Sequence, residues 1–186
     1  VSDIHFGRTP ASVLHPMFSR IADEADILLL CGDLTDTGDP EDGRALAREL
    51  SGIKLPMLAV LGNHDFECSQ TTELKAALAE GAIKVLDGDA TEVEGIGFAG
   101  AKGFAGGFGR GALGPWGEPA IKAVVQEALQ EALKFETALA KLRAGSRVAL
   151  LHYAPVAATV EGEPPEIYPF LGSSPDDDAR RQGAGQ

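Results

Sequence analysis

Leu61-Gly62-Asn63-His64-Asp65 is the stretch from which the rest of the sequence is best interpreted. It closes a short apolar run, Met57 to Leu61, that is typical of a buried strand. A glycine, an amide, an imidazole and a carboxylate follow in succession, a composition that suits a site better than a packed core. In open parallel sheets, sites form at the carboxyl ends of the strands. Because Gly-Asn is also a common turn signal, this stretch alone does not decide the function.

Two other stretches have the same composition. Val1-Ser2-Asp3-Ile4-His5 places a carboxylate and an imidazole two residues apart, and the apolar run Ile27 to Cys31 leads into Gly32-Asp33-Leu34-Thr35-Asp36. Three strand-like segments therefore each end in side chains that can bind a metal ion. Both side chains of the first pair reach one ion only if the backbone turns out of the strand there, because alternate residues share a face.

The apolar pattern predicts alternating helices and strands in the first half of the chain and a change after residue 82. The expected early elements are helices at 11–25, 41–50 and 69–80 and strands at 27–31 and 57–61. Short segments separated by turn residues then predict an antiparallel meander at 83–86, 91–94 and 96–100. A Gly-rich surface loop at 100–117, a long helix at 119–143 and a strand at 147–151 complete the pattern. We expect the long helix to turn one apolar face inward, formed by Ile121, Val124, Val125, Leu129, Leu133 and Leu139.

Length and composition favour one globular domain. The 186 residues are 44% hydrophobic and 24% charged, and we assign residues 1–172 to the domain and 173–186 to a polar, disordered tail. The net charge of -12 argues against a nucleic-acid-binding surface. The two cysteines give no disulfide framework, which favours the cytoplasm, and no apolar stretch is long enough to span a membrane.

The strand ends together offer carboxylate, imidazole and amide ligands. These residues are Asp3, His5, Asp33, Asn63, His64 and His152. This mixture suits Mn²⁺, Fe or Zn²⁺ better than Ca²⁺. One carboxylate can bridge two ions, and Asp33 on the central strand is the natural choice. Two ions about 3.5–4 Å apart clamp a phosphoryl group and convert a bound water into hydroxide near neutral pH.

Asp3-x-His5, Gly32-Asp33 and Gly62-Asn63-His64-Asp65 resemble the motifs of the calcineurin-like metallophosphoesterase family, and His152 in Leu150-Leu151-His152-Tyr153-Ala154-Pro155 is similar to a fourth. The resemblance implies an α/β fold, a four-layer α/β/β/α sandwich that is incomplete at both ends of this sequence. It also implies two divalent metal ions and a small phosphorylated substrate. The metal ligands that it implies are Asp3, His5 and Asp33 for one ion and Asp33, Asn63 and His152 for the other.

The resemblance further implies that His64 binds no metal and faces the phosphate, where an imidazole stabilises developing charge or protonates the leaving oxygen. Asp36, three residues after Asp33, is placed to hold that imidazole in one tautomer. Two features depart from the family. Thr37 stands where the protein phosphatases have an arginine, and the closing Gly-His-x-His motif, one ligand for each metal, is absent.

The sequence therefore predicts a metal-dependent hydrolase that attacks a phosphomonoester or phosphodiester with metal-activated hydroxide. The alternative is a non-catalytic scaffold that keeps the fold. For single residues, simpler interpretations stay open: the strand-end residues as polar caps, His152 as a hydrogen-bonded core histidine, and Asp36 as a turn cap.

Overall fold

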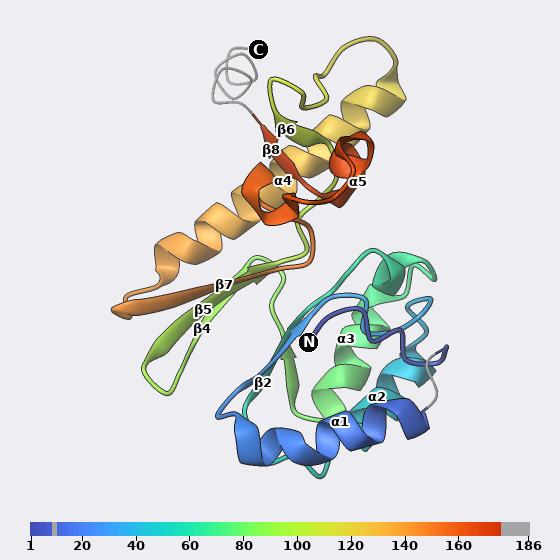
Figure 1. The fold of residues 1–186 in the computed structure, drawn as a ribbon, viewed down its shortest axis with the longest axis vertical. Helices are drawn as coiled ribbons and strands as arrows, with labels where there is room; N and C mark the ends of the chain where they lie inside the picture. The colour runs from blue at the N-terminus through green and yellow to red at the C-terminus, as the bar shows by residue number, and fades with distance from the viewer. Residues whose placement is uncertain (9–10, 176–186) are drawn as a thin grey trace.

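The computed structural model of the protein describes residues 1–8 and 11–175, and these form helices and strands in two sheets with a small third (Figure 1). The α-helices are α1 (Ala11–Glu24), α2 (Pro40–Leu50), α3 (Thr71–Glu80), α4 (Pro119–Lys141) and α5 (Tyr168–Leu171). The strands are β1 (Leu28–Cys31), β2 (Met57–Val60), β3 (Ile83–Val85), β4 (Asp89–Val93), β5 (Ile96–Ala101), β6 (Gly107–Gly109), β7 (Ser146–Leu151) and β8 (Ser173–Pro175). Short 3₁₀ turns are η1 (His64–Phe66), η2 (Ala157–Val160) and η3 (Pro165–Ile167).

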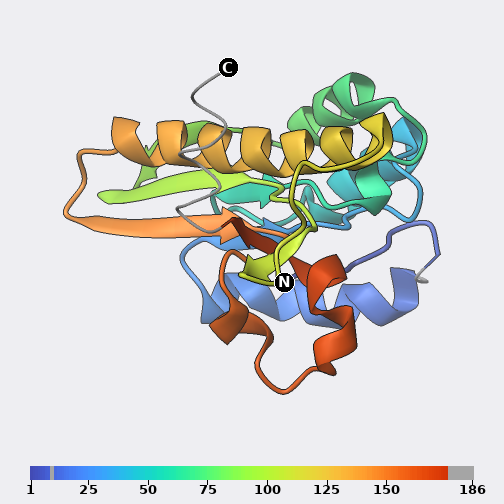
Figure 2. The ribbon, with the colours of Figure 1, turned by 90° about the horizontal axis from the view of Figure 1, so that it is seen from above.

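Four layers follow from the alternation of side chains along the strands. In β2, Met57 and Ala59 pack with the helices α1–α3, whereas Leu58 and Val60 pack between the two sheets. In β5, Phe98 joins the cluster between the sheets and Ala99 packs against α4. Helices α1–α3 and helix α4 therefore cover opposite faces of the paired sheets (Figure 1). Seen from above, helix α4 runs along the second sheet (Figure 2). The predicted α/β/β/α sandwich is confirmed.

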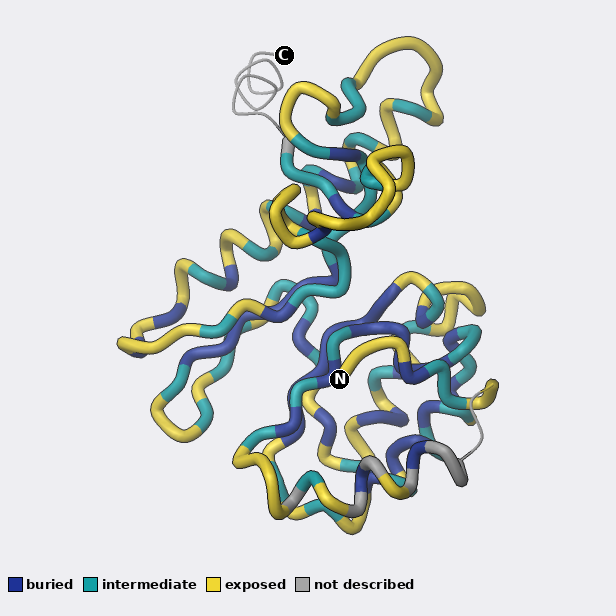
Figure 3. The backbone as a smooth tube through the Cα atoms, in the orientation of Figure 1, coloured by how far each residue is buried: buried dark blue, intermediate teal, exposed yellow. Residues whose placement is uncertain are grey.

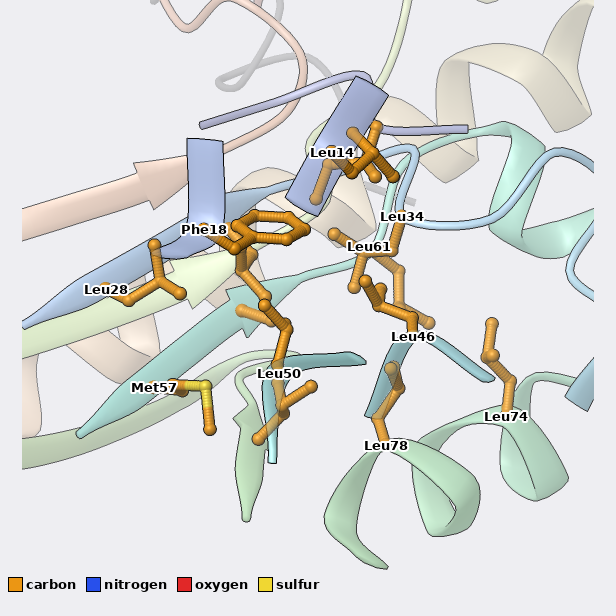
Figure 4. Close-up of a cluster of buried hydrophobic side chains, with 14 residues drawn as sticks. Leu14, Phe18, Leu28, Leu34, Leu46, Leu50, Met57, Leu61, Leu74 and Leu78 are labelled. Atoms are coloured by element: carbon orange, nitrogen blue, oxygen red, sulfur yellow. The ribbon is translucent and has the colours of Figure 1, made fainter. Parts of the chain in front are cut away.

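The largest core cluster lies between the first sheet and its helices. Leucine side chains from α2 and α3 meet Leu14 and Phe18 of α1 over the strand residues Leu28 and Met57 (Figure 4). These residues are nearly or fully buried. Burial contributes about 1.5–3 kcal/mol for each large apolar side chain. The cluster therefore holds the first strands firmly in place, and with them the starts of the loops that follow.

The first sheet is parallel, with strand order β1-β2-β3. Residues 1–6 extend it on the other side of β1. The main chain of Val1 bonds to Leu29 and Cys31, and the N–H groups of Asp3 and His5 donate to the carbonyls of Gly32 and Asp33. The carboxyl ends of the first segment, β1 and β2 consequently meet at one edge of the sheet.

The second sheet has the order β4-β5-β7, with β4 antiparallel and β7 parallel to β5. The predicted antiparallel meander is wrong for its first strand. Residues Ile83–Val85 form β3, which pairs with β2 in parallel, and Ile83 is buried among the residues of the first core. Local sequence distinguishes a strand from a helix but does not name the strand's partner, which is why the assignment failed here.

Helix α4 packs with only part of the face that we expected. Leu139 packs in the cluster with Ala138 and Leu142, and Ile121, Val125 and Leu129 are partly buried. Val124 and Leu133 are 37% and 59% exposed, whereas Ala128 and Ala138 are buried. Small residues on both elements explain this, because β5 presents mainly glycine and alanine and a Cβ at Gly97 would already lie 3.0 Å from Leu142. The helix therefore approaches the sheet mainly through alanines, and many of its other positions are exposed (Figure 3).

The end of the chain forms a small unit of its own. The Gly-rich loop contains β6, which pairs in parallel with β8. The expected disordered tail thus begins with a strand at residues 173–175, and residues 176–186 lie outside the described part of the chain. Among the described residues, no helix is both long and apolar enough to cross a lipid bilayer.

Candidate metal centre

The loops after the first strands leave the sheet through left-handed backbone conformations. Asp3, His5 and Asp33 have φ values of 56°, 45° and 49°, a region that residues other than glycine seldom occupy. The turn out of the strand that the Asp3-x-His5 spacing requires is therefore present. Such conformations cost about 1–3 kcal/mol each and persist where the surrounding structure enforces them, most often at functional sites.

The Asp33 carboxylate lies between two imidazoles. Its Oδ2 is 3.8 Å from His5 Nε2, and its Oδ1 is 3.6 Å from His152 Nε2. The main-chain N–H of His64 donates to Oδ1 at 3.0 Å, and Asp33 is only 4% exposed. Each oxygen of one fixed carboxylate thus faces a different histidine, which is the arrangement that a ligand shared by two metal ions requires.

Two groups of possible ligands share this carboxylate. One comprises His5, Asp33 and His64 and the other comprises Asp3, Asp33 and His152, with the ligand atoms of each group within 4.8 Å of one another. Asn63 adjoins the second group, since its Oδ1 is 3.1 Å from His152 Nε2. The structure brings together all the residues predicted from the strand ends. The grouping differs from the one that the resemblance implies, because Asp3 lies with His152 and His64 joins His5.

His64 is held by the main chain of Asp36. Its Nδ1 donates to the Asp36 carbonyl at 2.8 Å and also lies 3.2 Å from Glu67 Oε1. The bond to the carbonyl is the main cause of a raised His64 pKa, and the charges of Asp33, Glu67 and Asp36 add to it. We expected the Asp36 side chain to make this contact. That carboxylate instead lies 3.4 Å from His5 Nδ1, with neither atom in a hydrogen bond among the described residues.

Asp65 ties the loops of two strands together. This fully buried carboxylate accepts hydrogen bonds from the N–H groups of Leu34, Thr35 and Gly62 and from the Thr35 hydroxyl, at 2.8–3.1 Å. The sequence pattern did not predict this role for Asp65. By fixing the loop after β1 against the loop after β2, Asp65 sets the distance between Asp33 and Asn63.

Two glycines give the ligands room. A Cβ at Gly62 would lie 2.1 Å from Asp33 Oδ1, and one at Gly32, where φ is +89°, would lie 2.3 Å from His152 Nδ1. His152 Nδ1 is 3.2 Å from the Cys31 carbonyl, an outer partner of the kind that orients a metal-binding imidazole. Nε2 of His152 is thereby directed to the centre.

Lys102 and Tyr153 are further residues beside the centre that the sequence analysis missed. The Lys102 carbonyl accepts hydrogen bonds from the N–H groups of His152 and Tyr153. Its buried ammonium lies 4.5–5.5 Å from the ring centroids of Phe104, Phe66 and Tyr153, and burial lowers its pKa. Phe66 and Tyr153 follow His64 and His152 closely in the sequence, so proximity to the motifs was the available signal.

The ligand set is suited to divalent transition metals. Carboxylate oxygens and imidazole nitrogens converge around a shared, buried carboxylate, a donor set that fits a divalent transition metal ion. The sequence pattern of one family, the calcineurin-like phosphoesterases, matches residues 1–122. That range contains every residue of the centre except His152.

Solved structures have the same fold. One superposes with a TM-score of 0.57 at 15% identity, covering 93% of this chain and 74% of its own. The crystal structure of TT1561 of Thermus thermophilus superposes with a TM-score of 0.52 at 17% identity, covering 89% and 70%. No curated protein matches the chain. Because the family pattern spans most of the sequence and the site and fold agree with it, the chain belongs to the calcineurin-like phosphoesterase family.

Proposed function

We propose that this protein hydrolyses a phosphomonoester or phosphodiester with two divalent ions, Mn, Fe or Zn, bound on either side of Asp33. The observation that carries the proposal is the position of the Asp33 carboxylate, with one oxygen toward His5 and the other toward His152. Membership of the family supports a metal-dependent phosphoesterase. When bound, the ions supply Lewis-acid activation of the phosphoryl group and of the attacking water.

The side chains around Asp33 hold the metal ions and orient one another. Asp3, His5, Asp33, Asn63 and His152 are the ligands that we propose. Asn63 is a neutral donor, and its carbonyl oxygen already faces the His152 ring. Because Asp65 holds the β1 and β2 loops together, the carboxylate and the amide are positioned before a metal binds. Such preorganisation avoids the cost of ordering the ligands during binding.

His64 is the catalytic residue that we propose, with Asp36 as its positioning residue. Because Nδ1 donates to the Asp36 carbonyl, Nε2 is the nitrogen left to contact substrate. In its protonated form, which the raised pKa of His64 favours, Nε2–H stabilises charge on the phosphoryl group or gives its proton to the leaving oxygen and leaves a neutral imidazole. The same ring lies 4.5 Å from the ring of His5, centroid to centroid, so a role as a metal ligand is the competing assignment for His64.

A non-catalytic scaffold is the second candidate function, and the missing Gly-His-x-His motif favours it. This sequence has four histidines, of which His5, His64 and His152 already belong to the two ligand groups. We therefore expect this chain to bind at most about one equivalent of Mn²⁺ tightly and to turn over simple phosphodiesters slowly. The partner that we propose is a small phosphorylated substrate. We also propose a cytoplasmic location, which the free thiols of Cys31 and Cys68 support.

Metal binding and turnover of bis(p-nitrophenyl) phosphate test the proposal together. Asp33→Asn should lower Mn²⁺ binding in titration calorimetry more than Asn63→Ala does, since a shared ligand serves both positions. The control Asp89→Asn, an exposed carboxylate in β4, should bind as the unmodified chain does. His64→Ala should keep its Mn²⁺ and lose about 10²–10⁴-fold in turnover. Loss of metal from His64→Ala would make His64 a ligand, and absence of both metal and turnover in the unmodified chain would establish the scaffold.

A further inference from the structure

The first loop and the loop after β1 run side by side beyond the sheet. The N–H of Phe6 donates to the Leu34 carbonyl at 2.9 Å, and the N–H of Asp36 donates to the Phe6 carbonyl at 3.1 Å. Phe6 and Thr35 form a parallel bridge between the two loops. This pairing of the main chains places the side chains of His5 and Asp36, which flank the bridge, against each other.

The imidazole of His5 lies between two carboxylates. Its Nδ1 is 3.4 Å from Asp36 Oδ1, and its Nε2 is 3.8 Å from Asp33 Oδ2. Nδ1 and the Asp36 oxygen are both buried, and neither has a hydrogen-bond partner among the described residues. Arg8 Nη1 lies 4.0 Å from the same Asp36 oxygen, but the Arg8 side chain is 74% exposed, so solvent screens this contact. Each of the two buried atoms therefore has the other as its available partner.

A hydrogen bond between these two atoms determines which nitrogen of a neutral His5 ring is protonated. A small rotation of either side chain shortens the 3.4 Å separation to that of a hydrogen bond. An ionised carboxylate only accepts hydrogen bonds, so Nδ1 must carry the proton. Nε2 then has the lone pair, and it faces the Asp33 carboxylate that we propose as the shared metal ligand. Metal-binding imidazoles have such outer partners, which fix the tautomer and the orientation of the ring.

Asp36 contacts the second histidine through a different group. His64 Nδ1 donates to the main-chain carbonyl of Asp36 at 2.8 Å. This carbonyl remains when the side chain of Asp36 is replaced, so the tautomer of His64 does not depend on the carboxylate. Glu67 Oε1, 3.2 Å from the same nitrogen, is a second acceptor. The main chain of Asp36 thus orients His64, and its carboxylate is left for His5.

We infer that the Asp36 carboxylate is a positioning residue for His5, where it keeps the proton on Nδ1 and so leaves Nε2 free to bind a metal ion. The role of His5 as a metal ligand rests on the proposed function, but its tautomer is a property of the metal-free protein. Without the Asp36 carboxylate, Asp33 Oδ2 beside Nε2 is the other carboxylate oxygen that contacts the ring. The proton then moves to Nε2, and it must leave that nitrogen before a metal ion binds there.

Imidazole ¹⁵N and ¹H chemical shifts of the metal-free full chain test the inference, because they distinguish a protonated ring nitrogen from an unprotonated one. The measurement is made at alkaline pH, so that the rings are neutral. We expect Nδ1–H on both His5 and His64 in the unmodified chain. Asp36→Ala should move the His5 proton to Nε2 and leave the His64 proton on Nδ1. Glu67→Ala, which removes the carboxylate beside the other ring, is the matched control that should leave His5 unchanged.

Asp36→Asn keeps the size of the side chain and decides the question if Asp36→Ala does not fold. Its amide donates as well as accepts, so both tautomers of His5 should appear. In titration calorimetry, Asp36→Ala should weaken Mn²⁺ binding about 10–100-fold, the usual effect of losing an outer partner of a metal ligand. Asp36→Asn should weaken it less, and Asp89→Ala, at an exposed position in β4, should not change it.

The inference is overturned if His5 keeps its proton on Nδ1 in both Asp36 variants, or if the proton of His64 moves in place of it. Unchanged Mn²⁺ affinity in variants whose His5 tautomer has changed would overturn it as well, because the carboxylate would then position nothing that the metal requires. The spectra need neither metal nor substrate. Failure of the unmodified chain to bind metal or turn over substrate would therefore refute the proposed function without altering the tautomer result.

Discussion

Replacing Asp65 with alanine tests whether a buried carboxylate holds the two metal-binding loops together. The substitution leaves the N–H groups of Leu34, Thr35 and Gly62 without their acceptor in a fully buried place. An unsatisfied buried donor costs about 1–3 kcal/mol, so the three together cost roughly 3–9 kcal/mol. Water entering the vacated space offsets part of this, and we expect a loss of about 4 kcal/mol in the free energy of unfolding. Domains of this size have about 5–15 kcal/mol in total.

Urea unfolding of the metal-free protein measures the loss, with Asp39→Ala as the control. Asp39 caps helix α2 by accepting a hydrogen bond from the Glu41 N–H at 2.8 Å in a partly exposed position. Loss of such a cap costs about 1 kcal/mol. A loss for Asp65→Ala no larger than that for Asp39→Ala would refute the reasoning, because the buried donors would then have found other partners at little cost.

Two further predictions concern the space beside Asp33 and the pH dependence of stability. Gly62→Ala should weaken Mn²⁺ binding at least tenfold in titration calorimetry, because its Cβ would displace the Asp33 carboxylate. Gly52→Ala, with no atom within 4 Å of the new methyl group, is the control that should not change it. Burial alone would raise the pKa of Asp87, but bonds from two lysines lower it overall from the ordinary 3.8. The ionised form therefore stabilises the protein above pH 3.8, and this contribution is lost as the pH falls below that value. Asp87→Asn should have a lower urea midpoint at pH 7, and a difference that stays constant down to pH 3 would contradict the assignment.

The first sheet and its site could be predicted because short-range patterns determine both. The apolar runs at 27–31 and 57–61 allow few alternatives to buried parallel strands, and parallel strands bring their carboxyl ends to one edge. Polar residues directly after such runs must then converge. Asp33 and Asn63 lie where this argument places them. The residues at the start of the sequence could be placed in the same sheet because Asp3-x-His5 offers a carboxylate and an imidazole, as the ends of the other two strands do.

The contacts between individual atoms could not be predicted from the sequence in the same way. Asp36 was expected to hold His64 by its side chain, and the structure uses its carbonyl, because the left-handed turn at Asp33 redirects the main chain that follows. The sequence pattern predicted no role for Asp65, although it accepts hydrogen bonds from four donors in two loops. A sequence states which groups are available near a strand end. Which of them meet depends on φ values that differ between one loop and the next.

The second sheet was harder to predict because small residues mask its packing. Side-chain size carries the periodic signal, and β5 is built from Ile96, Phe98 and otherwise only glycine and alanine. Helix α4 covers this surface through Ala128 and Ala138, so its largest apolar residues are not its most buried ones.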